Sequence, residues 1–411
     1  MPLIKPFRGL RPPAERATDV AAPPYDVLNT EEARERAAGK PWSFLHISKP
    51  EIDLPAGTDP YSAEVYAKGA GNLARMVREG VLKRDSRPSY YAYRLIMGSH
   101  TQTGIVAAAS VDAYDAGRIR RHEFTRPDKE DDRVRQIEAL NAQTGPVLLA
   151  HPACPEVDRI LADAAATAPA ADVTADTGVR HTIWVIDDAA IVSRIGACFE
   201  ALPALYIADG HHRSAAASRV AAARKAAKGG NGEAGADYFL AVSFPAEQMQ
   251  ILCYNRVVRD LAGLQRDEFL RRVADAFSLD LAKGPVQPTV HGELGMYLPG
   301  QWYRLRVRPE RVPADPVGRL DVSLLSDQLL GPILGIKDLR TDKRIDFVGG
   351  IRGTQELEKR VDSGEMAVAF SMHATSMDDL MAVTDAKQVM PPKSTWFEPK
   401  LADGLVSHVL D

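Results

Sequence analysis

The spacing of hydrophobic positions predicts a series of strands and helices in the first part of the chain. Short hydrophobic runs, some alternating with polar residues, are typical of strands, and apolar residues three or four positions apart are typical of helices. The predicted strands are residues 90–97, 103–111, 146–151, 180–186, 204–208, 238–244 and 250–258. We expect the last two strands to pair with each other. The predicted helices are residues 30–38, 61–79, 128–140, 188–200 and 214–228.

Strands and helices also alternate in the C-terminal part of the chain. The predicted elements are helix 266–277, strands 295–298 and 302–307, helix 322–334, and strands 345–348 and 366–371. This alternation predicts an α/β protein with mixed α+β layers. The length favours two or three domains. We place a boundary between an N-terminal α/β region, residues 1–257, and a C-terminal α/β region, residues 258–411, whose last loop (390–400) can return to the site.

Glycines and polar residues mark the connections between these elements. The segment Gly98-Ser99-His100-Thr101-Gln102 predicts a short hairpin connection. Residues 228–235 contain four glycines in eight positions and are the strongest candidate for a mobile loop. Near the N-terminus, two prolines hold an extended backbone that can either present Tyr25 and Asp26 to a cleft or form a packed crossing.

Composition favours a globular cytoplasmic protein. Of the 411 residues 45% are hydrophobic, so the chain can form a packed core. The net charge of −4 argues against a dedicated nucleic-acid scaffold, which carries a marked basic excess. The three cysteines lie far apart and provide neither a disulfide framework nor a zinc site. The chain has no signal-peptide pattern and no apolar run of about 20 residues, so we expect no membrane contact. We expect its partners to be small molecules.

The strongest chemical signal is Asp209-Gly210-His211-His212-Arg213, directly after a predicted strand and before a predicted helix. A helix N-terminus attracts anions, and a glycine there lets a ligand approach the backbone. The aspartate can hold a cation or a hydroxyl group, while the histidines and the arginine can donate to phosphate oxygens. Adjacent histidines point in different directions, so we expect at most one to touch the reacting group. The alternative is a capping aspartate followed by surface histidines.

A second charged segment, residues 120–129, precedes helix 128–140 and contains His122 and Glu123. A carboxylate among several cations ionises readily, and beside a substrate hydroxyl it can act as a general base. The alternative is a solvated charged surface whose ion pairs contribute little to stability.

A third candidate is the loop with Lys393-Ser394-Thr395 followed by Lys400, which offers hydroxyls and cations to a phosphate. It is not a P-loop, because the preceding glycines are absent. Patterns of the GxGxxG, GxSxG and HExxH types are also absent, which argues against the commonest dehydrogenases, hydrolases and metalloproteases. We interpret the isolated His373 as a satisfied core histidine.

Several of these motifs, in this order, resemble the family known as domain of unknown function 1015 (DUF1015). They are Phe7-Arg8-Gly9-Leu10-Arg11-Pro12, Pro23-Pro24-Tyr25-Asp26-Val27, His122-Glu123-Phe124-Thr125, Asp209-Gly210-His211-His212-Arg213 and Met390-Pro391-Pro392-Lys393-Ser394-Thr395. The resemblance covers nearly the whole chain. Two of the motifs, His122-Glu123 and Asp209 to Arg213, are also similar to those of free serine kinases with a ParB/sulfiredoxin-like fold. The interval between the two motifs is longer here, which suggests a ParB/sulfiredoxin-like core elaborated by insertions.

The resemblance to free serine kinases implies nucleotide-dependent phosphoryl transfer to a small hydroxylated metabolite, with L-serine first among the acceptors. The expected cofactor is ATP or ADP with Mg²⁺, and Asp209 is the expected metal ligand. The implied catalytic residues are Glu123, Asp209 and His211. The implied phosphate-binding residues are His122, Gly210, His212, Arg213, Lys393, Ser394, Thr395 and Lys400. Two alternatives stay open, a metal-dependent phosphohydrolase and a non-catalytic nucleotide-binding regulatory protein.

Overall fold

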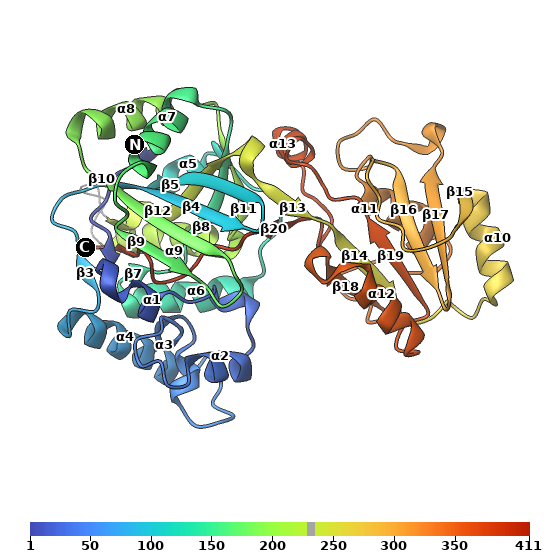
Figure 1. Cartoon of the computed structure of the whole chain (residues 1–411), viewed down its shortest axis with the longest axis horizontal. Coiled ribbons are helices and arrows are strands. Elements are labelled where there is room, and N and C mark those ends of the chain that lie inside the picture. Colours follow the sequence, from blue (N-terminus) through green and yellow to red (C-terminus); the bar gives the residue numbers. More distant parts are fainter. Residues whose placement is uncertain (228–234) are drawn as a thin grey trace. The chain divides into compact units, whose positions relative to one another are not determined.

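The computed structural model describes residues 1–227 and 235–411 and divides them into two compact units (Figure 1). The first unit consists of Met1–Met249 and Pro399–Asp411, and the second of Gln250–Glu398. Residue 257, after which we placed the boundary, lies in a strand of the second unit. The glycine-rich loop predicted at 228–235 lies outside the described residues, apart from Gly235.

The first unit is built on a nine-stranded mixed sheet, which confirms the predicted α/β class. Its strands, in order across the sheet, are β6 (Ile119–Arg120), β11 (Leu205–Asp209), β8 (Val147–His151), β12 (Tyr238–Pro245), β5 (His100–Ser110), β4 (Tyr90–Met97), β10 (Arg180–Ile186) and β9 (Ala171–Thr174), and β1 (Ile4–Lys5) pairs with β5. The pairs β6–β11 and β8–β12 are parallel, and the others are antiparallel. The strands predicted at 90–97, 146–151, 180–186 and 204–208 are confirmed.

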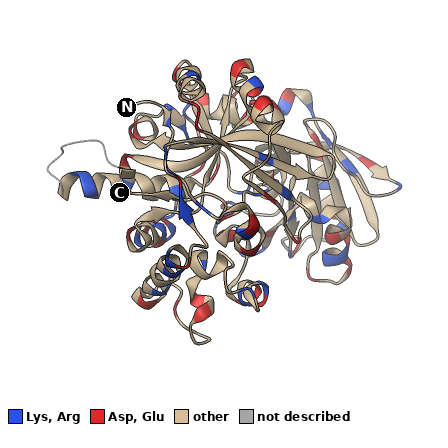
Figure 2. Cartoon of the chain, turned by 60° about the vertical axis from the view of Figure 1, so that its left-hand side comes forward, with Lys and Arg blue, Asp and Glu red and all other residues tan. Residues whose placement is uncertain are grey.

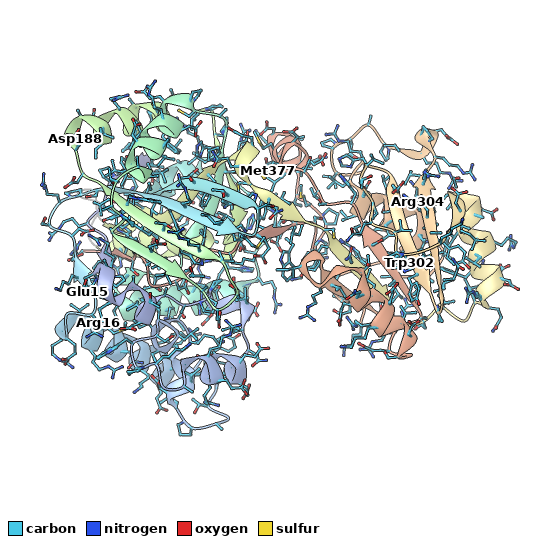
Figure 3. The ribbon with its side chains drawn as sticks, viewed as in Figure 1. Glu15, Arg16, Asp188, Trp302, Arg304 and Met377 are labelled. Carbon is cyan, nitrogen blue, oxygen red and sulfur yellow. The ribbon has the colours of Figure 1, made fainter. Side chains whose placement is uncertain are left out.

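Helices cover both faces of this sheet (Figure 1). On one face lie α7 (Pro155–Ala165) and α8 (Ala189–Glu200), and on the other α1 (Ala17–Val20), α2 (Thr30–Ala37), α3 (Leu45–Ser48), α4 (Ala63–Arg78) and α6 (Pro127–Leu140). Asp188, labelled in Figure 3, caps α8 by accepting the N–H groups of Ala190 and Ile191 at 3.0 Å. Beneath α7 and α8, buried Ile160 and Phe199 pack with sheet residues in the main core.

The alanine-rich helix α9 (His211–Ala227) is buried on two sides. Ala217 and Ala221 belong to the main core, whereas Ala216 and Val220 pack with Ile137 of α6. Small side chains allow this close packing on both sides, which fixes the position of α9 relative to β11, the strand that precedes it. The sequence predicted a helix from Ser214, but α9 begins three positions earlier, at His211, so that His211, His212 and Arg213 form its first turn.

Two predicted strand arrangements are wrong in detail. The connection between β4 and β5 consists of Gly98 and Ser99 alone, because Gly98 adopts φ +59° and allows a tight turn in which Met97 faces His100. The strands predicted at 238–244 and 250–258 do not pair with each other. Strand β12 pairs with β5 and β8, whereas β13 (Gln250–Leu252) and β14 (Tyr254–Val258) pair within the second unit.

The second unit contains a six-stranded antiparallel sheet in the order β15 (Phe277–Ala282), β17 (Gln301–Val307), β16 (Glu293–Leu298), β19 (Val368–Met372), β14 and β18 (Ile345–Gly349). Its helices are α10 (Arg266–Ala276), α11 (Asp321–Leu325), α12 (Gly353–Asp362) and α13 (Met377–Asp385), and β13 pairs with β20 (Trp396–Glu398). Trp302 and Arg304 both lie on β17 (Figure 3), and the Trp302 indole donates to Glu358 on α12 at 2.7 Å. The helix predicted at 322–334 is shorter, since α11 continues only as one wider turn, Ser326–Leu330.

Basic and acidic residues are interspersed along the helices (Figure 2). Among the described residues, no helix is long and apolar enough to cross a membrane.

Candidate functional site

The Asp209 motif forms a strand–turn–helix junction at an inner strand of the first sheet. Strand β11 ends at Asp209, Gly210 makes the turn, and α9 begins at once. Gly210 has φ +98°, and a Cβ there would lie 3.2 Å from the Cα of Val147 on β8. Any other residue would be both strained and crowded, so this turn requires glycine.

Asp209 is held by two cations. Its Oδ2 lies 3.3 Å from Lys400 Nζ and 3.8 Å from Arg213 Nη2, and its Oδ1 accepts the N–H of Gly210 at 2.8 Å. Burial raises the pKa of Asp209, but Lys400 and Arg213 offset this effect and hold the pKa well below its usual range. The carboxylate is therefore ionised, and about a third of it is exposed.

His211 connects the helix to the predicted base. Its Nε2 accepts the backbone N–H of His122 at 3.4 Å, and its Nδ1 lies 3.7 Å from Glu123 Oε2. Burial lowers the pKa of His211 well below its usual value, so the ring is neutral. Since Nε2 accepts, the proton of the neutral ring is on Nδ1, facing the glutamate. Half of the Glu123 side chain is exposed to solvent, where a substrate hydroxyl can reach it.

The other two histidines have different surroundings. His122 packs edge-on against His211 with ring centres 4.5 Å apart, and burial lowers its pKa to about 4. The Nδ1 of His122 is buried and has no hydrogen-bond partner among the described residues. His212 points elsewhere, because its Nε2 accepts the N–H of Arg126 at 3.1 Å. His211 alone of the adjacent pair therefore faces Glu123, in agreement with the divergence that the sequence predicted.

Arg213 is largely buried, with only 10% of its side chain exposed. It donates to the carbonyl of Pro146 and lies 3.6 Å from Asp26 Oδ2, while its buried Nε has no partner in the part of the chain that the structure describes. Burial lowers its pKa, but Asp26 and Asp209 outweigh burial, so the pKa is raised and the guanidinium stays charged.

A cavity of about 30 Å³, large enough for ordered water, lies beside Arg213 and is lined by both polar and apolar residues. Tyr25, Arg133 and Asp403 line it together with Arg213, and the Arg133 guanidinium lies 3.9 Å from the centre of the Tyr25 ring. Asp403 is 2% exposed, its Oδ1 has no partner among residues 1–227 and 235–411, and burial raises its pKa to about 7. Tyr25 was a candidate from the sequence, whereas Arg133 and Asp403 were missed. The apolar neighbours of Asp403 were the one local sign that this acid is buried.

The structure brings together most of the residues predicted for the site. His122, Glu123, the five residues from Asp209 to Arg213, and Lys400 all lie in the first unit and are linked by the contacts above. Lys393, Ser394 and Thr395 belong to the second unit. There the Lys393 carbonyl accepts from Arg256 at 2.9 Å, and Ser394 Oγ donates to the Pro391 carbonyl at 2.6 Å. A role for these three residues in phosphate binding stays a prediction.

Comparison with solved structures finds similarities at low identity. SbnI with a C-terminal truncation, from Staphylococcus aureus, is 12% identical, with a TM-score of 0.39 and coverage of 73% of this chain and 86% of that one. Free serine kinase in complex with AMP is 12% identical, with a TM-score of 0.33 and coverage of 74% and 92%. A conserved hypothetical protein from Pyrococcus furiosus is 14% identical, with a TM-score of 0.33 and coverage of 74% and 94%.

No curated protein sequence matches the chain. A family model does match it, over residues 4–323, a range that includes the His122-Glu123 and Asp209–Arg213 motifs at the centre of the site. The chain therefore belongs to the DUF1015 family, which is described as a protein of unknown function and which the sequence motifs had predicted.

Proposed function

We propose that the first unit transfers a phosphoryl group from a nucleotide to the hydroxyl group of a small metabolite, with L-serine as the first acceptor to test. The observation that carries this proposal is the convergence of Glu123, His211 and Asp209 at the N-terminus of α9. This small region thus contains a half-exposed carboxylate, a neutral histidine and an ionised aspartate. The cations Arg213 and Lys400 lie beside the aspartate.

The N-terminus of α9 suits phosphate groups. The first N–H groups of a helix have no acceptor within that helix, and its dipole favours negative charge. Arg213 and Lys400 add positive charge next to Asp209, and the buried Nε of Arg213 is a donor without an acceptor among the residues that the structure describes. The residues present therefore fit nucleotide phosphates. Asp209 is the carboxylate available for a Mg²⁺ ion that accompanies those phosphates, since Mg²⁺ in such sites usually takes one or two protein carboxylates.

Glu123 is the proposed general base. It takes the proton of the acceptor hydroxyl while the new O–P bond forms, and the bond between the transferred phosphorus and the rest of the nucleotide breaks. The bound nucleotide, ATP or ADP, supplies the phosphoryl group. The Nδ1–H of His211 faces Glu123 at 3.7 Å and orients it once the two groups close to hydrogen-bond distance. Arg213 and Lys400 stabilise the negative charge on the phosphoryl oxygens. Catalysis in this arrangement rests on positioning and electrostatics, without a covalent intermediate.

Incubation of the full-length protein with Mg²⁺, L-serine and either ATP or ADP tests the proposal. We expect O-phosphoserine by mass spectrometry, together with the nucleotide that has lost one phosphate. A panel of other small alcohols tests the acceptor separately from the reaction. If no acceptor is phosphorylated, the kinase proposal is wrong. Nucleotide hydrolysis without an acceptor then supports the phosphohydrolase, and nucleotide binding without turnover supports the regulatory protein.

A further inference from the structure

A second group of chemically reactive side chains lies in the second unit, far along the chain from the motifs discussed above. His291 precedes β16, Asp321 is the first residue of α11, and His373 follows β19 directly. Each of the three offers one ligand atom, and these atoms all lie within 4.8 Å of one another. Three separate segments of the chain thus place two imidazoles and a carboxylate around one point.

The distances suit ligands of a common ion. His291 Nδ1 lies 3.8 Å from Asp321 Oδ1, and His373 Nδ1 lies 3.9 Å from Asp321 Oδ2. Two ligands at about 2.1 Å from a tetrahedral metal lie roughly 3.4 Å apart. A shift of a few tenths of an ångström would therefore bring both pairs to coordination geometry. Both separations are too long for a direct hydrogen bond.

Two polar atoms of this three-residue cluster are buried and have no hydrogen-bond partner among the described residues. They are Asp321 Oδ2 and His373 Nδ1, and the Asp321 side chain is only 4% exposed. A buried carboxylate oxygen without a partner is costly to the fold. A single cation between these atoms would satisfy both. His373, which we interpreted from the sequence as a satisfied core histidine, is therefore not satisfied at its Nδ1.

The surrounding residues hold the three side chains in orientations suited to a metal. His291 Nε2 lies 3.2 Å from Asp379 Oδ2 on α13, the helix whose first residue, Met377, is labelled in Figure 3. A carboxylate on Nε2 places the ring proton there and leaves the lone pair on Nδ1, which faces Asp321. The N–H of Gly292 donates to Asp321 Oδ1 at 2.8 Å and fixes this carboxylate as well.

We propose that His291, Asp321 and His373 bind a divalent transition-metal ion of the Zn²⁺ class, with Asp379 as the outer carboxylate that orients His291. Two imidazoles and one carboxylate form a donor set that suits such ions, whereas Mg²⁺ and Ca²⁺ prefer oxygen ligands. The His291 side chain is half-exposed, so one side of the ion is open to solvent. This proposal does not rest on the proposed phosphoryl transfer, because the three ligands lie in the second unit and none of them takes part in the proposed reaction. The matched family segment ends at residue 323, before His373.

Metal titration of the full-length protein tests this site. After chelator treatment and buffer exchange, we expect one Zn²⁺ per chain in equilibrium dialysis, and Co²⁺ should give the visible absorption bands of a low-coordinate site. The variants His373→Ala and Asp321→Asn should lose both signals. Asp379→Asn should keep the stoichiometry but weaken Zn²⁺ binding by about 10- to 100-fold. If the wild type takes up no Zn²⁺, or if the ligand variants bind as the wild type does, the assignment is wrong.

Matched controls separate this site from surface binding and from misfolding. His100→Ala removes a histidine of the first unit, and Asp378→Asn removes an exposed carboxylate next to Asp379, so both should bind Zn²⁺ as the wild type does. His291→Ala changes a half-exposed side chain, so it should perturb the fold least among the ligand variants, and loss of Zn²⁺ with wild-type stability in urea unfolding separates ligand removal from unfolding. Equal losses in the controls and the ligand variants would mean adventitious binding and would overturn the proposal.

Discussion

Lys400 Nζ lies 3.3 Å from Asp209 Oδ2, so a lysine close to the C-terminal end of the described chain contacts the end of an inner strand, β11. Lys400 and Arg213 together keep Asp209 ionised at the N-terminus of α9. Lys400 also places a positive charge where a phosphate group is expected.

Replacement of Lys400 by Met is expected to weaken nucleotide binding more than it weakens the fold. The ion pair is about one-third exposed, so its loss should lower the free energy of unfolding by at most about 1 kcal/mol. A hydrogen bond to a charged phosphate contributes roughly 1.5–3 kcal/mol, so Kd should rise about tenfold or more. Calorimetric nucleotide titration and urea unfolding measure the two effects. Lys225→Met, at the exposed far end of α9, is the control, and equal Kd values for both variants would exclude Lys400 from the site.

Glu123→Gln should abolish turnover and preserve nucleotide binding. The amide keeps the shape of the side chain but cannot accept a proton, and general-base catalysis typically contributes 10²- to 10⁴-fold to the rate. We therefore expect kcat to fall by about that factor, with little change in the Kd for nucleotide, as measured by phosphoserine formation and calorimetry. Glu138→Gln, an exposed change on α6, should leave both unchanged. Full turnover by Glu123→Gln would remove this residue from the mechanism.

Gly210→Ala should be more destabilising than an alanine in a comparable but uncrowded turn. A left-handed alanine costs about 1–2 kcal/mol by itself, and at Gly210 the new Cβ would also press on the backbone of Val147. Gly178 has a similar φ of +82° and open space around its Cβ position, so Gly178→Ala reports the strain alone. Urea unfolding of the two variants gives the difference. Equal losses would show that the close contact with Val147 can relax.

The buried histidines should make the protein less stable in acid. Burial lowers the pKa of His122, His181 and His408 to about 4 and that of His151 to about 3, from an ordinary value of 6.5. Between these values the unfolded chain binds more protons, so the free energy of unfolding falls as pH decreases from about 6.5 to 4. His151→Gln should flatten this slope by up to about 1.4 kcal/mol per pH unit in urea unfolding. A stability that does not change between pH 7 and 5 would contradict this account.

Asp403 should have the opposite effect over a similar range. Burial raises its pKa to about 7 from 3.8, so the folded state retains the proton and the contribution of Asp403 to stability is lost as pH rises from about 4 to 7. Relative to the wild type, Asp403→Asn should therefore gain stability as pH increases across this window. The stability difference between the two proteins, measured by urea unfolding at each pH, isolates Asp403 from the histidines. Exposed Asp187→Asn should show no such trend.

The sequence predicted correctly those elements that are specified by residues next to one another in the chain. The hydrophobic run at 204–208, followed by Asp209 and Gly210, predicted the strand and turn, because an apolar strand and a glycine turn are specified by neighbouring residues. The start of α9 was placed too late, since polar His211 and His212 carry no hydrophobic periodicity although the first turn of the helix accepts them. The pairing expected between 238–244 and 250–258 failed because strand partners are chosen by tertiary packing.

Two groups of contacts between distant segments could not be predicted from the sequence. Asp403 lies beside Arg213 and Tyr25 because the C-terminal segment pairs with the N-terminal one, where Ala22 faces Asp403. His291, Asp321 and His373 come from three segments whose spacing matches no metal-binding motif. In both cases the distinguishing feature is a buried polar atom that has no hydrogen-bond partner among the described residues: Oδ1 of Asp403, and Oδ2 of Asp321 with Nδ1 of His373. Only the folded chain shows this feature.

The division of the chain has a consequence for biosynthesis. Since Pro399–Asp411 belongs to the first unit, the second unit is inserted within it, and the first unit is formed by two stretches that emerge from the ribosome far apart in time. Lys400 and Asp403 reach Asp209 and Arg213 only after the whole second unit has been translated. Until then the nascent first unit lacks part of the proposed phosphate site, so the order of synthesis would delay the proposed activity until the inserted unit has been made.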